Sequence, residues 1–121
     1  MRSRMSEPAN SGPRPALLPG TLDLIVLRTL QTMGPLHSYA IAARLQQVSG
    51  EQLRLNQGTL YPALVRLEQE GAIQASWRRT ANNHEARYYA LTRAGEQRLA
   101  AETRRWRQAA GLIETLLAEE A

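Results

Sequence analysis

The chain has 121 residues, 15 of them basic and 11 acidic, and every basic residue is an arginine. This length predicts one domain with a modest core, and a basic excess made of guanidinium groups suits contact with phosphate and guanine. The absence of cysteine excludes disulfides, thiol catalysis and cysteine-based zinc sites, and it fits a reducing cytoplasm, where we expect the protein to act.

Residues 1–18 are rich in Pro, Ser, Gly and Arg and offer little that a core would bury, so we expect a disordered N-terminal arm. The arm lacks the apolar stretch of a secretory signal. No run in the chain approaches the roughly 18 apolar residues of a membrane span, and we expect no membrane partner. A basic arm can contact a phosphate backbone, but an untidy terminus or a misassigned start is the simpler interpretation.

Two helices are expected to follow. The first begins at Thr21, a good N-cap, carries Asp23 where the helix dipole favours an acid, and ends at Gly34. Its dense apolar content predicts burial on more than one side, in the core or at a subunit contact. The second helix runs from Ser38, as its cap, to Val48.

The stretch from Asn56 to Gly71 has the period of an amphipathic helix, with Asn56 as the expected N-cap. Its inner face consists of four apolar residues at helical spacing: Leu60, Ala63, Leu64 and Leu67. Its outer face carries hydrogen-bonding groups and one cation: Gln57, Thr59, Tyr61 and Arg66. Two helices joined by a short Gly-containing turn, the second with a polar outer face, predict a helix-turn-helix that reads DNA.

Pro62 conflicts with a regular helix interior, because it removes one hydrogen bond and clashes with the preceding turn. We therefore expect regular helix to start near Gly58, after an irregular first turn that presents Thr59 and Tyr61. Thr59 contacts DNA or caps the helix, and Tyr61 contacts DNA or packs over the following hairpin.

Gln57 and Arg66 also lie on the outer face of this helix. Gln57 suits adenine, which a side-chain amide can contact through two hydrogen bonds. Arg66 contacts phosphate or guanine, or it pairs with Glu70 four residues later in a weak helix salt bridge.

The next two segments predict a β-hairpin. Ile73–Arg79 and Ala86–Leu91 alternate as strands around a polar turn with two asparagines. After a helix-turn-helix such a hairpin is a wing, and we expect its arginines to cluster at the far end beside a phosphate backbone: Arg78, Arg79 and Arg87. Tyr88 and Tyr89 should point to opposite faces, with one in the core. His37 and His84 have no second ligand at metal-binding spacing, so no metal site is expected.

Thr92 is expected to cap a last helix that reaches Leu117, about 26 residues and roughly 39 Å. An apolar stripe follows this helix, with seven-residue intervals between three of its members: Leu99, Trp106, Ala110, Ile113 and Leu117. Because the helix is longer than so small a domain is wide, the stripe favours a dimerisation arm over a helix that folds back on its own domain.

These elements predict a mainly α (α+β) fold. Residues 19–91 would form a winged helix-turn-helix domain, and residues 92–121 a C-terminal dimerisation helix. The strings LLPGTLDLIVLRTL, NQGTLYPALVRLEQEGAI and ARYYALTRAGEQRL resemble the PadR family of winged helix-turn-helix transcriptional regulators, over about Leu17 to Ala118. The single last helix resembles the short PadR subgroup. The resemblance implies a homodimer held mainly by its last and first helices. It also implies a repressor of an inverted-repeat operator in double-stranded DNA, often released by a small effector.

The resemblance also carries residue roles. Thr59, Tyr61 and Pro62 match the DNA-facing start of the recognition helix, and Tyr39 matches the aromatic residue at the start of the second helix. Ser38 departs from the family's usual glycine but retains capping ability. Trp106 matches a tryptophan that flanks a cavity for flat aromatic effectors between subunits, although core packing at the interface competes with that role.

The sequence also bears on two other classes of function. The alternative function is a winged-helix module that binds proteins without specific DNA binding. An enzyme is not expected, because the sequence offers no nucleophile–base pair, phosphate loop or carboxylate dyad, and no cofactor is expected.

Overall fold

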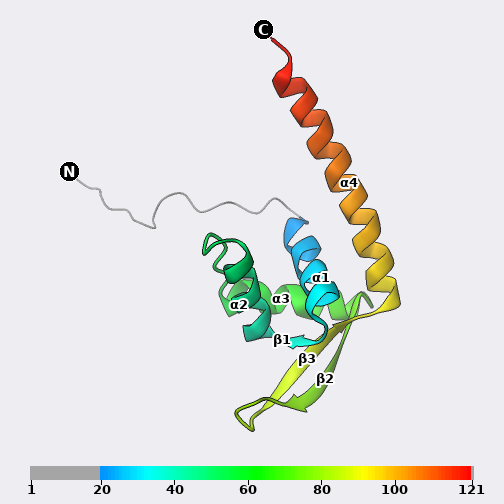
Figure 1. The fold of residues 1–121 in the computed structure, drawn as a ribbon. Coiled ribbons are helices and arrows are strands. Elements are labelled where there is room, and N and C mark those ends of the chain that lie inside the picture. The colour runs from blue at the N-terminus through cyan, green and yellow to red at the C-terminus, as the bar shows by residue number, and fades with distance from the viewer. Residues whose placement is uncertain (1–19, 121) are drawn as a thin grey trace, which may run out of the picture.

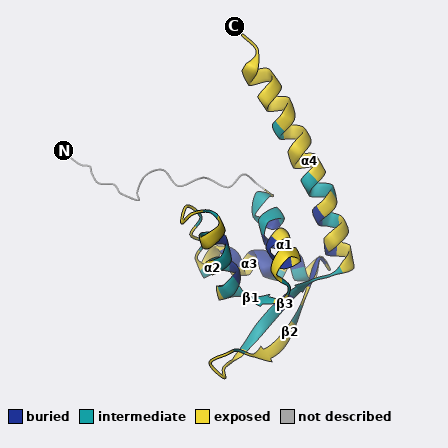
Figure 2. Cartoon of the chain, viewed as in Figure 1, coloured by how far each residue is buried: buried dark blue, intermediate teal, exposed yellow. Residues whose placement is uncertain are grey.

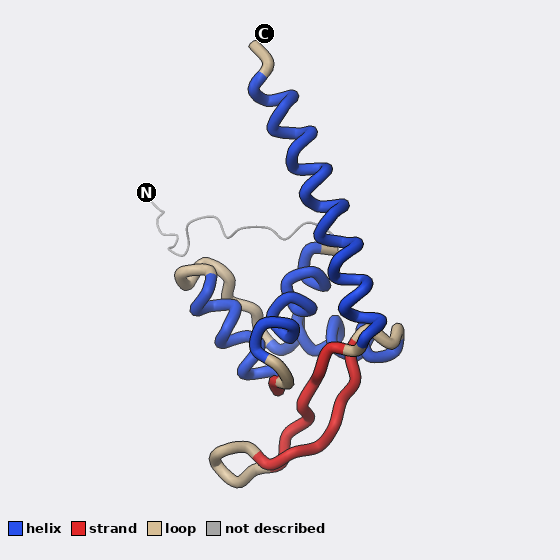
Figure 3. Tube along the Cα trace, turned by 45° about the vertical axis from the view of Figure 1, so that its right-hand side comes forward, coloured by secondary structure: helices blue, strands red, loops and turns tan. Residues whose placement is uncertain are grey.

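The computed structural model describes residues 20–120, and the expected N-terminal arm, residues 1–18, lies outside the described residues. The elements follow in the order α1 (Thr21–Met33), β1 (Leu36–His37), α2 (Ser38–Val48), α3 (Gln57–Gln69), β2 (Ile73–Arg79), β3 (Glu85–Leu91) and α4 (Arg93–Ala118) (Figure 1). The predicted mainly α fold with a hairpin after the third helix is confirmed. In the 45° view of Figure 3 the hairpin extends from one end of the helical body and α4 from the other.

The core lies where α1, α2 and α3 meet, and both the sheet and α4 contribute to it. Hydrophobic burial is the main favourable term in folding, and the inner face of α3 contributes to it: Leu60, Ala63, Leu64 and Leu67 are all buried, as predicted. Tyr89 of β3 is buried as well, whereas its neighbour Tyr88 is partly exposed. The expectation that one of these two tyrosines faces the core is therefore confirmed.

The sheet has three antiparallel strands in the order β1-β3-β2. The two-residue strand β1 is not predicted by the sequence and pairs Leu36 with Tyr89 and His37 with Tyr88. β3 is therefore the central strand, and β2 is an edge strand. The turn between β2 and β3 places Asn83 at φ 63°, a left-handed conformation that asparagine tolerates.

Helix starts differ from the sequence expectations in three places. Gly20, with φ 87°, occupies the N-cap of α1 in place of Thr21. His37 caps α2 in place of Ser38, because its Nδ1 accepts the amide of Ala40 at 3.3 Å. The third difference is at Pro62: α3 is helical from Gln57, so Pro62 lies inside the helix and the expected irregular first turn is wrong.

Pro62 is tolerated in α3 at the cost of one helical hydrogen bond, because proline offers no N–H to the carbonyl of Gly58. Gly58 is exposed to solvent, so water can satisfy that carbonyl. Asn56 caps the helix as predicted, since its Oδ1 accepts the amide of Thr59 at 2.9 Å. The cap thus offsets part of the cost of the proline.

α4 begins against the body and then leaves it. Thr92 caps α4 by accepting the amide of Gly95 at 3.0 Å, and its hydroxyl donates to the carbonyl of Gly71 at 2.6 Å. Beyond its first turns the helix projects away from the domain, and its distal half is mostly exposed (Figures 1 and 2). The first turns of α4 thus pack on their own domain, while its distal half does not fold back on it.

Candidate nucleic-acid interface

The outer face of α3 is open to solvent at its N-terminal end. Thr59, Tyr61 and Pro62 are exposed there, and Gln57 is half-buried. The structure thus brings these four predicted residues together on the first turns of one helix. A helix N-terminus also directs free amide groups and a positive partial charge outward, which favours an anion such as phosphate. Tyr39 is exposed as well, in the first turn of α2.

Arg66 lies on the same helix but is already engaged within the chain. Its Nη2 and Nη1 donate to the two carboxylate oxygens of Asp23 in α1 at 2.6 and 2.8 Å. The expected pair with Glu70 is present at a longer distance, 3.7 Å. The hydrogen bond with Asp23 raises the pKa of Arg66 above its usual value. Since a bidentate pair of this kind holds the guanidinium in place, the structure favours the intrachain role of Arg66 over DNA contact.

Arg87 lies in the wing, the hairpin formed by β2 and β3, one pair nearer the helices than Arg78. It stands opposite Trp77, two positions before the last pair of the hairpin. Its Nη2 donates to Glu68 of α3 at 2.8 Å, which raises the pKa of Arg87, and its guanidinium lies 5.9 Å from the centre of the Trp77 ring. Arg87 therefore attaches the wing to α3.

Arg78 and Arg79 lie at the far end, as predicted. Arg79 donates from Nη1 to the carbonyl and the side-chain oxygen of Asn83 at 3.2 and 3.1 Å, which braces the turn. Arg78 is exposed, and its guanidinium lies 5.5 Å from the centre of the Tyr88 ring. Within residues 20–120 neither arginine has an acidic partner. The wing tip therefore presents two guanidinium groups that form no salt bridge with any carboxylate of residues 20–120.

Trp77 is a candidate contact that the sequence analysis did not single out. Strand alternation places it on the same side as Ile73 and Ala75, which predicts an inner position. Ile73 is buried, but the side chain of Trp77 is 65% exposed, because β2 extends beyond the helices that cover its first residues (Figure 2). The exposure of Trp77 depends on how far β2 extends beyond the helices. The local sequence pattern does not contain that information.

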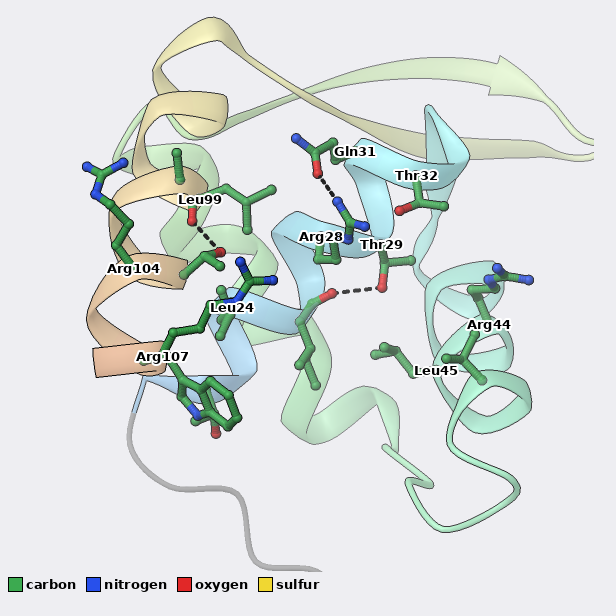
Figure 4. A pocket seen from close by; sticks show the side chains of 16 residues that line it. Leu24, Arg28, Thr29, Gln31, Thr32, Arg44, Leu45, Leu99, Arg104 and Arg107 are labelled. Atoms are coloured by element: carbon green, nitrogen blue, oxygen red, sulfur yellow. Dashed lines mark hydrogen bonds between the residues drawn. The ribbon is translucent and has the colours of Figure 1, made fainter. Parts of the chain in front are cut away.

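A second open surface lies between α1, α2 and α4, and no residue of α3 or the wing lines it. It is a groove of about 1000 Å³ with an apolar floor that includes Leu24, Leu45 and Trp106. Arginines from all three helices line the groove, and Figure 4 labels four of them: Arg28, Arg44, Arg104 and Arg107. The groove adjoins the predicted dimerisation stripe and not the predicted DNA-binding face.

The predicted dimerisation stripe of α4 divides into two parts. Leu99 is 3% exposed and packs into the core of its own chain, so the structure corrects its assignment to a subunit interface. Ala110 is half-buried. Ile113 is 54% exposed, and Trp106 and Leu117 are exposed as well. These distal residues remain available to a partner.

Other kinds of site find little support in the described part of the chain. No group of three or more His, Asp or Glu side chains is arranged to hold a metal ion there. None of the helices within residues 20–120 is long and apolar enough to cross a membrane.

Comparison with known proteins agrees with this architecture. A PadR family structure from Eggerthella lenta is 27% identical, covers 84% of this chain and 85% of its own, and gives a TM-score of 0.72. A transcriptional regulator from Clostridium thermocellum is 25% identical, covers 79% of this chain and 92% of its own, and also gives 0.72.

A protein in a transposon of Streptomyces fradiae, of 37.1 kDa, is 39% identical over 80 residues, which are 66% of this chain. The chain spans about a fifth of that relative's length. The model of the transcriptional regulator PadR-like family matches residues 26–101, well over half of the chain and all of α2, α3 and the wing. The chain therefore belongs to the PadR-like family of transcriptional regulators.

Proposed function

We propose that the protein is a homodimeric repressor that binds an inverted-repeat operator in double-stranded DNA and acts in the cytoplasm. One observation carries this proposal: the outer face of α3 is left open at the helix N-terminus, where Thr59, Tyr61 and Pro62 are exposed. A helix presented in this way fits the major groove, whose base edges distinguish all four base pairs. The proposal requires neither catalysis nor a cofactor.

The wing supplies the proposed sequence-independent part of the affinity. Arg78 and Arg79 carry charge without acidic partners in the described residues, and the exposed Trp77 lies beside them. Such groups suit the phosphate backbone that flanks the groove, because released counterions drive that contact. Gln57 and Tyr39 belong to the same proposed surface. Arg66 and Arg87 do not, because acidic side chains of this chain already bind them.

The experiment that tests this proposal is selection of bound DNA from a random library, followed by affinity measurement on the consensus. A consensus made of two inverted halves about one helical turn apart is expected. Tyr61→Ala should weaken binding to that consensus while the circular dichroism spectrum stays unchanged, and Tyr61→Phe separates the hydroxyl from the ring. If the library gives no consensus above non-specific binding, the alternative of a protein-binding winged-helix module is favoured.

The proposed dimer rests on the exposed distal half of α4 and on the groove beside it. Four large apolar side chains of that half are exposed: Leu112, Ile113, Leu116 and Leu117. Acidic residues accompany them near the end of the helix at positions 114, 119 and 120, whereas arginines surround the apolar groove. The two surfaces are complementary in polarity and in charge, so the distal α4 of one copy suits the groove of another.

A pair of substitutions on opposite sides of α4 tests the dimer. Ile113 lies on the stripe with Trp106, Ala110 and Leu117, while the exposed Thr115 points about 160° away from Ile113 around the helix. Ile113→Asp should produce monomers in sedimentation velocity, because it places a charge in the apolar contact. Thr115→Asp introduces the same charge on the opposite side of the helix and should remain dimeric. Dimers of Ile113→Asp would contradict the assignment of the stripe.

A small aromatic effector is the last part of the proposal. Trp106 lines the groove together with several arginines, which suits a planar aromatic acid. The chain has two tryptophans, so Trp77→Phe leaves Trp106 as a specific fluorescence probe. A planar aromatic acid such as a cinnamic acid should quench that fluorescence and release operator DNA at the same concentrations. Quenching without release would leave Trp106 with a packing role at the interface.

A further inference from the structure

Five charged side chains from three helices meet at the junction of the DNA-facing helix and the arm. Arg98 of α4 uses all three of its nitrogens on different carboxylates: Nη2 on Asp23 at 3.0 Å, Nη1 on Glu70 at 2.6 Å and Nε on Glu102 at 2.9 Å. Arg66 of α3 binds the same Asp23 through two hydrogen bonds. Asp23 of α1 thus lies between the two guanidinium groups.

This network differs from an ordinary surface ion pair in geometry and in burial. An isolated exposed pair holds its side chains loosely and adds little. Here the side chain of Asp23 is 10% exposed and that of Arg98 is 28% exposed, and each guanidinium is held by more than one hydrogen bond. Bidentate and multiple contacts of this kind define an orientation as well as an attraction. The network therefore constrains how the helices lie relative to one another.

The network lies near the start of α4, where it can fix the direction of this helix relative to α3. The start of α4 is attached where the Thr92 hydroxyl and amide bind the carbonyls of Gly71 and Ala72 at 2.6 and 3.1 Å. Gly95 and Leu99 are buried beside this point and pack the first turns of α4 on the core, but apolar packing defines the angle of a helix less sharply than directed hydrogen bonds do. Arg98 adds a second attachment between α4 and the end of α3, through Glu70. Two attachments fix the direction of α4 relative to α3.

The length of α4 amplifies any change in that direction. The helix has 26 residues, which corresponds to about 39 Å at 1.5 Å per residue. A rotation of about 5° at its base moves its far end by roughly 3 Å, since the displacement is the length times the angle. That displacement is close to the rise of one base pair, about 3.4 Å. In a dimer in which the distal half of α4 of each copy packs in the groove of the other, the same rotation alters the distance between the two α3 helices.

We propose that Arg98 and its partner Asp23 are positioning residues that set the half-site spacing at which the dimer binds DNA. This inference rests on the dimeric DNA-binding function proposed above. Neither side chain contacts DNA in this arrangement, because both act by holding α3 at a fixed angle to α4. Loss of the joint should therefore affect the recognition of two half-sites together and leave the recognition of one half-site intact.

The test measures spacing preference by fluorescence anisotropy. The probes are the selected inverted repeat, the same repeat with its spacer lengthened or shortened by one and two base pairs, and a single half-site. Arg98→Met keeps the apolar stem of the side chain but removes the guanidinium group, with its charge and its hydrogen bonds. Arg105→Met is the matched control, because Arg105 lies on the same helix, its side chain is 69% exposed, and it reaches only Glu102, at 4.0 Å.

Wild type and Arg105→Met should prefer the selected spacing at least tenfold over its neighbours. Arg98→Met should reduce that preference to about threefold or less while its half-site affinity stays within about twofold of wild type. Equal preference in Arg98→Met and Arg105→Met would overturn the inference. So would a parallel loss of half-site affinity, because that result indicates a general structural defect.

Two further measurements separate the other outcomes. Glu70→Gln removes one carboxylate at the link between α3 and α4 and leaves the Asp23 pairs in place, so it should show a smaller loss of spacing preference even if Arg98→Met does not fold. An unchanged preference in a folded Glu70→Gln variant, alongside an unfolded Arg98→Met variant, contradicts the inference. A wild-type protein that binds no inverted repeat overturns the proposed function, and the inference with it.

Discussion

Replacing Gly95 with alanine should destabilise the protein, although alanine is the better helix former. Gly95 is the third residue of α4 and is buried. A Cβ atom at this position would lie 2.0 Å from the carbonyl oxygen of Ala72 and 2.8 Å from Cδ1 of Leu91. The Ala72 carbonyl cannot move freely, because it accepts the amide of Thr92 at 3.1 Å. The start of α4 therefore has to shift by roughly 1.5 Å to restore an ordinary contact of about 3.5 Å.

The expected magnitude follows from two opposing effects. Overpacking against backbone costs about 3 kcal/mol, the upper part of the usual range, while glycine to alanine in a helix contributes about 1 kcal/mol in the other direction. The free energy of unfolding of Gly95→Ala should thus fall by about 2 kcal/mol. For a domain of this size that lowers Tm by roughly 8 to 16 °C.

Gly111→Ala is the matched control on the same helix. A Cβ atom at Gly111 meets nothing within 4 Å, and the residue lies outside the apolar stripe of α4. It should raise Tm by roughly 4 to 8 °C through helix propensity alone. Both variants are compared by thermal unfolding at one protein concentration, because the Tm of a dimer depends on concentration. A Tm for Gly95→Ala at or above that of Gly111→Ala would refute the close packing of α4 on Ala72.

Three further outcomes are expected. Asn56→Ala should lower the free energy of unfolding in urea by about 1 kcal/mol, because the amide of Thr59 loses its cap at 2.9 Å. Burial raises the pKa of the Tyr89 hydroxyl. The contribution of this neutral hydroxyl to stability is complete below about pH 10 and is lost as the pH rises through the pKa of the folded state. The Tm should therefore fall less steeply above about pH 10 in Tyr89→Phe than in the wild type. Arg78→Ala with Arg79→Ala should flatten the salt dependence of operator affinity by about one unit per lost phosphate contact, for any DNA sequence.

The local periodicity of apolar residues predicted the inner face of α3 and the bounds of two other elements closely. All four inner residues predicted for α3 are buried, and the predicted end of α4 at Leu117 differs from the observed one by one residue. The same holds for the strand Ile73–Arg79, whose bounds are as predicted. In α3 the apolar pattern arises directly from the face that the core covers, whereas in β2 and α4 the pattern continues beyond the residues that the core buries.

Features that depend on distant partners were not predictable in this way. Asp23 and Arg66 are 43 residues apart, so helix spacing suggested only the local partner Glu70. The strand β1 has two residues, too few to show any alternation, and it forms because β3 offers a free edge. At Pro62 the local rule that proline disrupts a helix predicted an irregular turn. Burial of the leucines of α3 keeps the helix regular there.

The apolar stripe of α4 shows why a pattern identifies a face but not what covers that face. Leu99 and Ile113 occupy equivalent positions, two seven-residue intervals apart, yet Leu99 is 3% exposed and Ile113 is 54% exposed. The difference arises from the reach of α1, which covers only the first turns of α4 (Figure 1). The stripe therefore changes from intrachain core to uncovered surface along one helix. Leu99 fixes α4 to its own domain, which makes the distal part a rigid extension suited to transmit the angle set at Arg98.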